Sequence, residues 1–315
     1  MAHSEAPRPD ESWRRIAISG ASGFLGCALA VRLRAQGITV QRMRRGARAA
    51  PPDLAWRPES GEIDTAALNV VDAVVNLAGA PIARRWTERR KREILESRIR
   101  GTRLLADTVA RLDRKPRVFV SGSAIGIYGS RGDEELDEDS RPGNDFLAQT
   151  AAAWEEAAAP ASAAGIRVLF LRTGVVLNPA GGALAKLLLP YKLGLGGRVG
   201  SGAQWMSWIG LEDWLNAVGF ALAANLAGPV NLVAPNPVPN VDFVKTLARV
   251  LGRPAMMPLP EPAVELLFGE MGRSTLLGSQ RVHPRRLHEA GFEFSHPTLE
   301  QALRAELGRG DPPRP

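Results

Sequence analysis

The sequence is poor in cysteine and tyrosine: among 315 residues there is one cysteine, Cys27, and there are two tyrosines. A single cysteine cannot close an intramolecular disulfide and cannot supply a cysteine-rich metal site. No apolar run is long enough to span a membrane, and residues 1–12 lack the apolar core of a signal peptide. We therefore expect a cytoplasmic protein with a disordered tail at residues 1–12 and with no membrane partner.

Acidic residues are outnumbered, because 33 Asp and Glu stand against 40 Lys and Arg, a formal net charge of +7. A predicted helix at 87–112 concentrates basic residues on one face, but Glu88, Glu93 and Glu96 are interspersed among them. This mixture favours a solvated helix surface over a nucleic-acid interface. The acidic run at 133–139 lacks the spaced ligands of a calcium loop, so we expect a loop there and no metal.

Glycines are spaced regularly after the first apolar run, which we predict to be a strand from Arg14 to Ser19. Gly20, Gly23 and Gly26 follow, and a helix is predicted over residues 24–36. In a strand–turn–helix of this kind the glycines allow a sharp turn, a close approach of a diphosphate and tight helix packing. The free N–H groups of the helix end then face the anion. The alternative is a turn whose glycines serve packing alone.

The second predicted strand, at 38–43, is followed by arginines. An acidic residue there would accept the ribose hydroxyls of NAD, but the chain continues with Arg44 and Arg45. Arginines suit a 2′-phosphate, so the sequence favours NADP over NAD. The alternative is a solvated basic loop in an arginine-rich protein.

Strands and helices alternate through the first half of the chain. Beyond the elements above, we predict strands at 70–77, 117–123 and 166–171 and helices at 87–112 and 144–159. This alternation predicts an α/β fold with a doubly wound parallel sheet. Ligands of such sheets lie at the carboxyl ends of the strands. Five residues fall at such ends: Gly20, Arg44, Gly79, Ser123 and Thr173.

The last part of the chain changes character. Residues 193–202 are rich in glycine and are expected to form a mobile loop over the cleft, and a strand at 228–233 is expected to return to the sheet. Residues 255–305 predict two or three short helices separated by prolines. We therefore expect a cofactor domain at 13–180 with a return segment at about 203–235. The expected smaller, mixed substrate subdomain comprises 181–202 and 236–308.

These residues resemble the extended and atypical short-chain dehydrogenase/reductase superfamily, whose fold is a Rossmann fold. Gly20–Gly26 matches its GxxGxxG motif, and 76–79 and 121–129 match two further landmarks in order. Within that superfamily the chain is similar to the atypical branch labelled epimerase family protein. The stretches that carry this closer likeness are 76–87, 97–105, 121–129, 171–182 and 193–209. Residues 268–292 resemble the C-terminal domain of unknown function of that branch.

The resemblance implies NADP(H) as cofactor and assigns its contacts. The glycine-rich turn, with Ser22, Phe24 and Leu25, would hold the diphosphate, and Arg44 and Arg45 would meet the 2′-phosphate. The adenosine and ribose side would be lined by Leu77, Ala78 and Gly79. The nicotinamide side would be lined by Ser121, Gly122, Thr173, Gly174 and Val175.

The chain departs from most of the superfamily at the Tyr-x-x-x-Lys dyad. Phe146 takes the tyrosine position and Thr150 the lysine position, as the atypical branch also lacks the dyad. Phenylalanine cannot transfer a proton. Ser123 and Tyr128 remain as candidate catalytic residues, and Arg172 as a candidate anion contact.

Two functions stay open at this point. The first is an NADP(H)-binding oxidoreductase or nucleotide-sugar-epimerase-like enzyme with a non-standard acid or base. Its partner would be a small molecule such as a sugar nucleotide or a carbonyl compound. The alternative is a non-catalytic NADP(H)-binding protein that senses redox state and acts through a partner protein.

Overall fold

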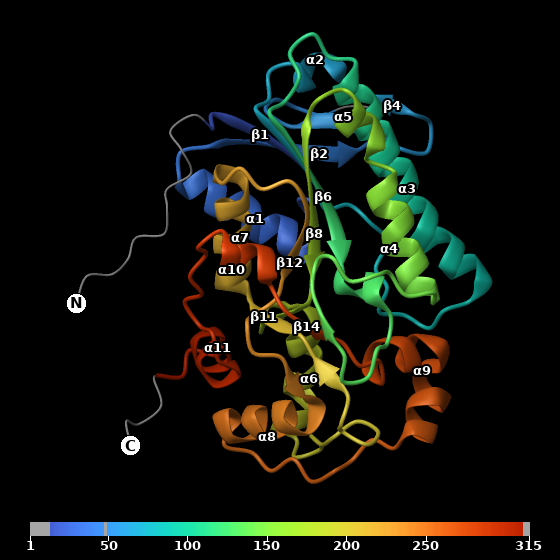
Figure 1. Cartoon of the computed structure of the whole chain (residues 1–315), viewed down its shortest axis with the longest axis vertical. Helices are drawn as coiled ribbons and strands as arrows, with labels where there is room; N and C mark the ends of the chain where they lie inside the picture. The colour runs from blue at the N-terminus through green and yellow to red at the C-terminus, as the bar shows by residue number, and fades with distance from the viewer. Residues whose placement is uncertain (1–12, 47–48, 311–315) are drawn as a thin grey trace.

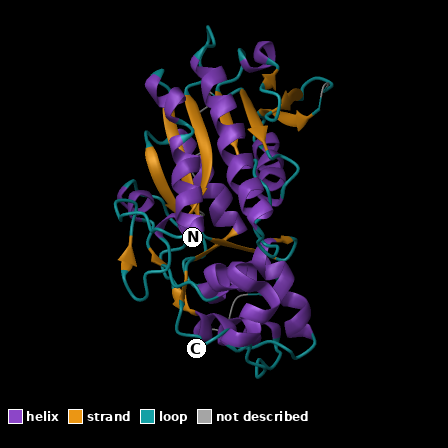
Figure 2. Ribbon diagram, turned by 90° about the vertical axis from the view of Figure 1, so that its right-hand side faces the viewer, coloured by secondary structure: helices purple, strands orange, loops and turns teal. Residues whose placement is uncertain are grey.

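The computed structural model describes residues 13–46 and 49–310, and a layered α/β body stands above a smaller, mostly helical part (Figure 1). The tail predicted at 1–12 lies outside the described residues. Figure 2 shows helices packed in front of the strands of the upper body. Among the described helices, none combines the length and the apolar character needed to cross a bilayer.

One eight-stranded sheet forms the centre of the upper body, in the order β12-β8-β6-β5-β1-β2-β3-β4. All neighbours are parallel except β3 and β4, which are antiparallel at the edge. The strands are β1 (Arg15–Ser19), β2 (Thr39–Arg45), β3 (Leu54–Arg57), β4 (Glu62–Ile63), β5 (Ala73–Asn76), β6 (Val118–Ala124), β8 (Arg167–Thr173) and β12 (Gly228–Leu232). The chain leaves β1 toward β2 on one side and reaches β5 on the other, so a crevice is expected outside their carboxyl ends.

Helices cover both faces of this sheet. On one face, α1 (Phe24–Ala35) and α7 (Leu211–Ala223) bury apolar side chains such as Leu29 and Trp214 in one core. On the other face, α3 (Glu88–Ala110) and the short α2 (Thr65–Leu68) and α5 (Ala159–Ala163) pack in a second core around Phe119. α4 (Phe146–Glu156) lies beside α3. The predicted doubly wound fold is confirmed.

The smaller part has an apolar core of its own, which includes Leu184, Trp208, Phe243 and Leu303. These side chains come from α6 (Gly182–Lys192), β11 (Trp208–Gly210), α8 (Asn240–Leu251) and α11 (Leu299–Glu306). The remaining elements are η1 (Ile125–Tyr128), β7 (Glu135–Leu136), β9 (Val175–Asn178), β10 (Trp205–Met206), β13 (Val238–Pro239), α9 (Glu261–Leu276), β14 (Arg281–Val282) and α10 (Arg285–Glu289). The separate core supports a second unit, while the predicted boundaries at 13–180, 203–235 and 236–308 stay a prediction.

Three elements differ from the sequence-based expectations. The helix predicted at 144–159 is two helices, because α4 ends at Glu156 and α5 begins with Pro160 in its first turn. α6 was not expected, and Pro190 lies inside it near its end. The strand predicted at 70–77 is reduced to β5, since Val70 is exposed and only residues 73–76 pair with β1.

Candidate functional site

The turn between β1 and α1 requires glycine at two positions. Gly20 has φ +70°, and a Cβ there would lie 2.7 Å from the carbonyl carbon of Leu77. A Cβ on Gly26 would lie 2.3 Å from the carbonyl oxygen of Gly20. Gly23 is the N-cap of α1 and offers no side-chain cap, so the first N–H groups of the helix are free for a ligand.

Buried hydrogen bonds hold the end of β1 against β5. Ser19 Oγ donates to Asn76 Oδ1, and Asn76 Nδ2 donates to Thr102 Oγ1 on α3 at 2.7 Å. The N–H of Ala78 donates to Ser19 Oγ at 3.3 Å. The segment Leu77–Gly79 therefore lies beside the glycine-rich turn, as the sequence predicts for one ligand-binding edge.

The two arginines at the end of β2 differ in their partners. Arg44 Nε donates to Asp53 Oδ2 at 2.8 Å, and Arg42 donates to both oxygens of the same carboxylate. These bonds outweigh burial, which acts in the opposite direction, and lower the pKa of Asp53. The side chain of Arg45 is exposed and makes no hydrogen bond or ion pair with any described residue. Arg45 is therefore the freer cation for a phosphate.

Asp53 is a residue that sequence reasoning missed. Its carboxylate lies beside the end of β2, where an acidic residue would accept ribose hydroxyls. Its side chain is only 7% exposed, and its carboxylate forms ion pairs with Arg42 and Arg44. It therefore does not offer a free acceptor for the ribose hydroxyls of NAD.

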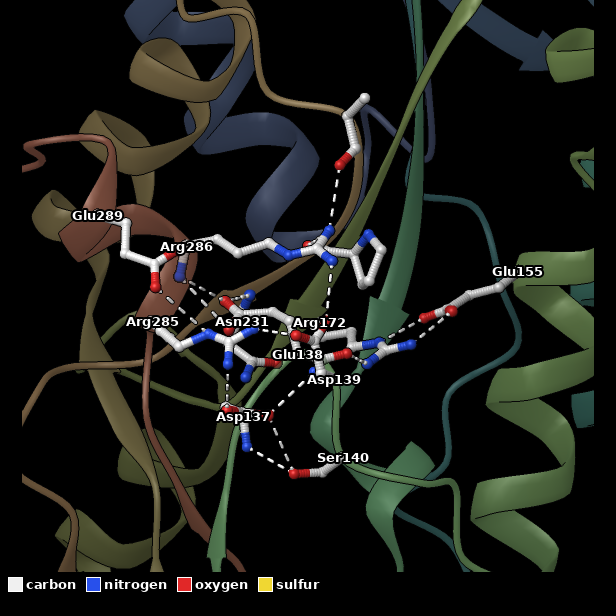
Figure 3. Close-up of polar contacts among 12 residues, drawn as sticks. Asp137, Glu138, Asp139, Ser140, Glu155, Arg172, Asn231, Arg285, Arg286 and Glu289 are labelled. Atoms are coloured by element: carbon white, nitrogen blue, oxygen red, sulfur yellow. Dashed lines mark hydrogen bonds and ion pairs between the residues drawn. The ribbon is translucent and has the colours of Figure 1, made fainter.

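The end of β6 carries a charged network that the sequence did not reveal. Ser123 Oγ donates to Glu155 Oε1 on α4 at 2.7 Å. Arg172 on β8 binds both oxygens of Glu155, each at 2.9 Å, as Figure 3 shows. Burial alone would lower the pKa of Arg172, but its bonds to Glu155 and Tyr128 raise it above its ordinary value. Arg172 thus donates four hydrogen bonds within the protein, which argues against its predicted role as an anion contact.

Tyr128 belongs to the same network. Its hydroxyl donates to Asn231 Oδ1 at 2.7 Å and accepts from Arg172 Nη1 at 3.0 Å. The side chain is 0% exposed, and burial raises its pKa to about 12. A hydroxyl in this position cannot reach a bound substrate. The position of Tyr128 therefore argues against its role as a proton donor.

Phe146 and Thr150, which stand at the tyrosine and lysine positions of the dyad, supply no acid or base for proton transfer. The ring of Phe146 packs edge-on against Trp86, and Lys91 lies over its face. Thr150 is buried, and its Oγ1 has no hydrogen-bond partner. Among the described residues, no group of three or more His, Cys, Asp and Glu side chains is placed to hold a metal ion.

The remaining predicted contacts lie along the same edge of the sheet. Ser121 is buried and donates to the carbonyl of Gly122, so its hydroxyl is turned inward. Gly174 is needed as glycine, since a Cβ would lie 2.7 Å from the carbonyl oxygen of Ser207. Thr173 accepts from Trp214 Nε1, and Val175 pairs with Trp208. Ser22 is exposed on the turn, while Phe24 and Leu25 are partly buried in α1.

The glycine-rich segment 193–202 was expected to lie over the cleft as a mobile loop. In the structure, hydrogen bonds connect it to the smaller part. The N–H of Val199 donates to Asn240 Oδ1 at 2.9 Å, and Val199 forms a bridge with Leu259. The N–H of Met257 also donates to the carbonyl of Gly196. The contacts agree with the expected place of 181–202 in the smaller subdomain, and mobility over a cleft stays a prediction.

The model of the NAD dependent epimerase/dehydratase family matches residues 16–233, and a domain of unknown function (DUF1731) matches residues 259–306. An epimerase family protein of Mycobacterium bovis is 47% identical over 290 residues, covering 91% of this chain and 96% of that protein. An epimerase family protein of Bacillus subtilis is 40% identical over 294 residues, covering 91% of this chain and 96% of that protein.

Two solved structures are similar along nearly the whole chain. The crystal structure of a human epimerase family protein with NADPH has a TM-score of 0.85 at 36% identity, covering 93% of this chain and 99% of that one. The nucleoside-diphosphate sugar epimerase from Corynebacterium glutamicum has a TM-score of 0.78 at 36% identity, covering 94% of this chain and 59% of that one.

The strand order, with β2 and β5 on either side of β1, and the glycine-rich turn define a Rossmann fold of the short-chain dehydrogenase/reductase type. With the family model and these relatives, the chain belongs to the NAD dependent epimerase/dehydratase family. The predicted resemblance to the epimerase family protein branch is confirmed.

Proposed function

We propose that the protein binds NADP(H) and acts as an oxidoreductase or epimerase-like enzyme on a small molecule, either a carbonyl compound or a sugar nucleotide. The observation that carries this proposal is the obligatory glycine turn of β1–α1 beside the free guanidinium of Arg45. The NADPH in the human relative supports the choice of cofactor. The residues present fit the group, because α1 begins at Gly23 without a side-chain cap, which leaves its first N–H groups for a diphosphate.

The proposed cofactor contacts follow the strand ends. The N–H groups at the start of α1 would bind the diphosphate, Arg45 the 2′-phosphate, and Leu77–Gly79 the adenosine side. When bound, the nicotinamide supplies the hydride chemistry. The chain itself orients the substrate beside the ends of β6 and β8 and moves its proton.

For the proton, the proposal depends on Ser123 and Glu155. The hydroxyl of Ser123 would orient the substrate oxygen, and the hydrogen bond to Glu155 Oε1 gives the hydroxyl proton an acceptor. The bidentate contact with Arg172 fixes that carboxylate in place. Glu155 thus supports the role that Tyr128, in its buried position, cannot take.

Arg45→Ala should raise the Kd for NADPH about tenfold or more, because a charge-assisted hydrogen bond contributes about 1.5–3 kcal/mol. Arg44→Ala should have a smaller effect, since Arg44 is already bound to Asp53. Quenching of the seven tryptophans measures both affinities. NADH lacks the 2′-phosphate and is the control; equal weakening of NADH and NADPH in Arg45→Ala would refute this assignment.

Ser123→Ala should lower turnover at least tenfold, about 1.4 kcal/mol of barrier, while the Kd for NADPH stays near its wild-type value. Turnover is followed by nicotinamide absorbance against panels of carbonyl compounds and sugar nucleotides. Ser60→Ala, at an exposed site, is the matched control. Unchanged turnover in Ser123→Ala would remove this serine from the site.

The second candidate function is a non-catalytic NADP(H)-binding sensor of redox state. The observation that favours it is the pair Phe146 and Thr150, which offers no acid or base. It predicts NADPH binding without turnover, and capture of a partner protein that differs between NADP⁺ and NADPH. Capture that ignores the redox state of the cofactor counts against it.

A further inference from the structure

Arg98 is a half-buried cation near the strand ends of the proposed cofactor site. It comes from α3, and its guanidinium lies 4.9 Å from the centre of the Trp154 ring on α4. Its Nη1 donates to the carbonyls of Ile94 at 3.0 Å and Ala80 at 3.1 Å. Its Nε and Nη2 make no hydrogen bond with the described residues. Three N–H bonds therefore remain for another acceptor.

Arg98 also differs from the other cations of α3. Arg90, Lys91 and Arg100 each pair with a glutamate. The other unpaired arginines of this helix are exposed, so water solvates them: Arg89, Arg92 and Arg103. Arg98 is not exposed and has no carboxylate partner within the described part of the chain. A cation taken out of water without an anion is unfavourable, so its position needs an explanation.

The surroundings of Arg98 are the strand ends of the proposed cofactor site. A Cβ on Gly79 would lie 3.1 Å from Cζ of Arg98, so glycine leaves room for the guanidinium after β5. A Cβ on Gly122 would lie 2.8 Å from Cη2 of Trp154, so the ring beneath the guanidinium rests on β6. Arg98 thus lies between the carboxyl ends of β5 and β6.

The charge state of Arg98 fits an anion ligand. Burial, with a smaller contribution from the charge of Arg90, lowers the pKa of Arg98 to about 10. The group is still charged at neutral pH, and a bound anion would restore its pKa. Ionisable groups whose pKa values are strongly shifted are candidates for ligand contacts.

We propose that Arg98 is the cation of an anion subsite between the ends of β5 and β6, which takes a phosphate or carboxylate group. The proposal deepens the proposed function and rests on it, because the proposed function identifies these strand ends as the cofactor site. The anion comes either from the dinucleotide or from a negatively charged substrate. Both sources share the chemistry that a guanidinium recognises through paired N–H bonds.

The test compares wild type with Arg98→Met and with Arg103→Met, an exposed control on the same helix. NADPH is titrated first, and inorganic pyrophosphate is then titrated into protein saturated with NADPH. If the anion belongs to the cofactor, Arg98→Met weakens NADPH binding at least tenfold. If it belongs to the substrate, NADPH binding is unchanged and pyrophosphate binding weakens at least tenfold. Arg103→Met should change neither affinity by more than twofold.

Arg98→Gln guards against a folding defect, because the amide can still donate to the carbonyl of Ala80. It should show the same loss as Arg98→Met. If neither NADPH nor pyrophosphate depends on Arg98, or if Arg103→Met has an equal effect, the proposal is overturned. If wild type fails to bind NADPH, the proposed function fails, and pyrophosphate titrated into the cofactor-free wild type and Arg98→Met proteins then decides this inference.

Discussion

Gly26→Ala should abolish NADPH binding at concentrations that saturate the wild type, a loss of at least 100-fold in affinity. A Cβ at this position would lie 2.3 Å from the carbonyl oxygen of Gly20 and 2.8 Å from its carbonyl carbon. Both are backbone atoms of the turn, so the turn or the start of α1 has to move. Such overpacking costs about 1–3 kcal/mol of stability and displaces the N–H groups that would bind the diphosphate.

Two measurements check this expectation: tryptophan quenching by NADPH and the free energy of unfolding in urea. Gly219→Ala is the matched control, because Gly219 lies within α7 and a Cβ there has no heavy atom within 4 Å. It should leave NADPH binding unchanged and stabilise the protein by about 0.5–1 kcal/mol. NADPH binding by a folded Gly26→Ala protein with wild-type affinity would exclude the turn as the diphosphate site.

Arg172→Met should lower the free energy of unfolding by about 3–5 kcal/mol, because it leaves a buried carboxylate without its partner. Arg172 and Glu155 have side chains only 8% and 12% exposed. The substitution also removes the bonds of Arg172 to the hydroxyl of Tyr128 and to the carbonyl of Glu138. Because Glu155 also accepts from Ser123, the same change should reduce turnover.

Chemical denaturation measures this loss, and an exposed ion pair supplies the comparison. Arg273 pairs with Glu265 at 2.9 Å, but both side chains are at least half exposed. Arg273→Met should therefore cost less than about 1 kcal/mol. Equal, small losses in Arg172→Met and Arg273→Met would show that the Glu155 carboxylate is not desolvated.

The parallel sheet and its order of elements were predictable because they rest on local patterns. Apolar runs ending in small residues marked β1, β5 and β6, and the spacing of Leu29 and Leu33 marked α1. The tie of segment 193–202 to Asn240 and Leu259 was not predictable, since glycine content reports flexibility of the chain and says nothing of its partners.

In the candidate site, too, the residues defined by local sequence were predictable and the contacts between distant segments were not. Gly20, Gly26 and Arg45 were recognised from their positions after strands. The hydrogen bonds of Tyr128 and Arg172 could not be, because their partners Asn231 and Glu155 are distant in sequence: 103 residues separate the first pair and 17 the second. Sequence pattern shows that a polar residue is near a strand end, but it does not show that the hydroxyl of Tyr128 and the guanidinium of Arg172 are already hydrogen-bonded within the fold.

The doubly wound sheet and the glycine turn followed from the sequence alone because each depends on spacing within short segments, and the family followed from motifs along most of the chain. Only the tertiary structure decided which charges are free. Asp53 pairs with Arg44 and leaves Arg45 open, Glu155 pairs with Arg172, and Arg98 is half-buried with no carboxylate partner among the described residues. The physical reason is that a charged group is neutralised or left unpaired by neighbours that the folding of distant segments brings together.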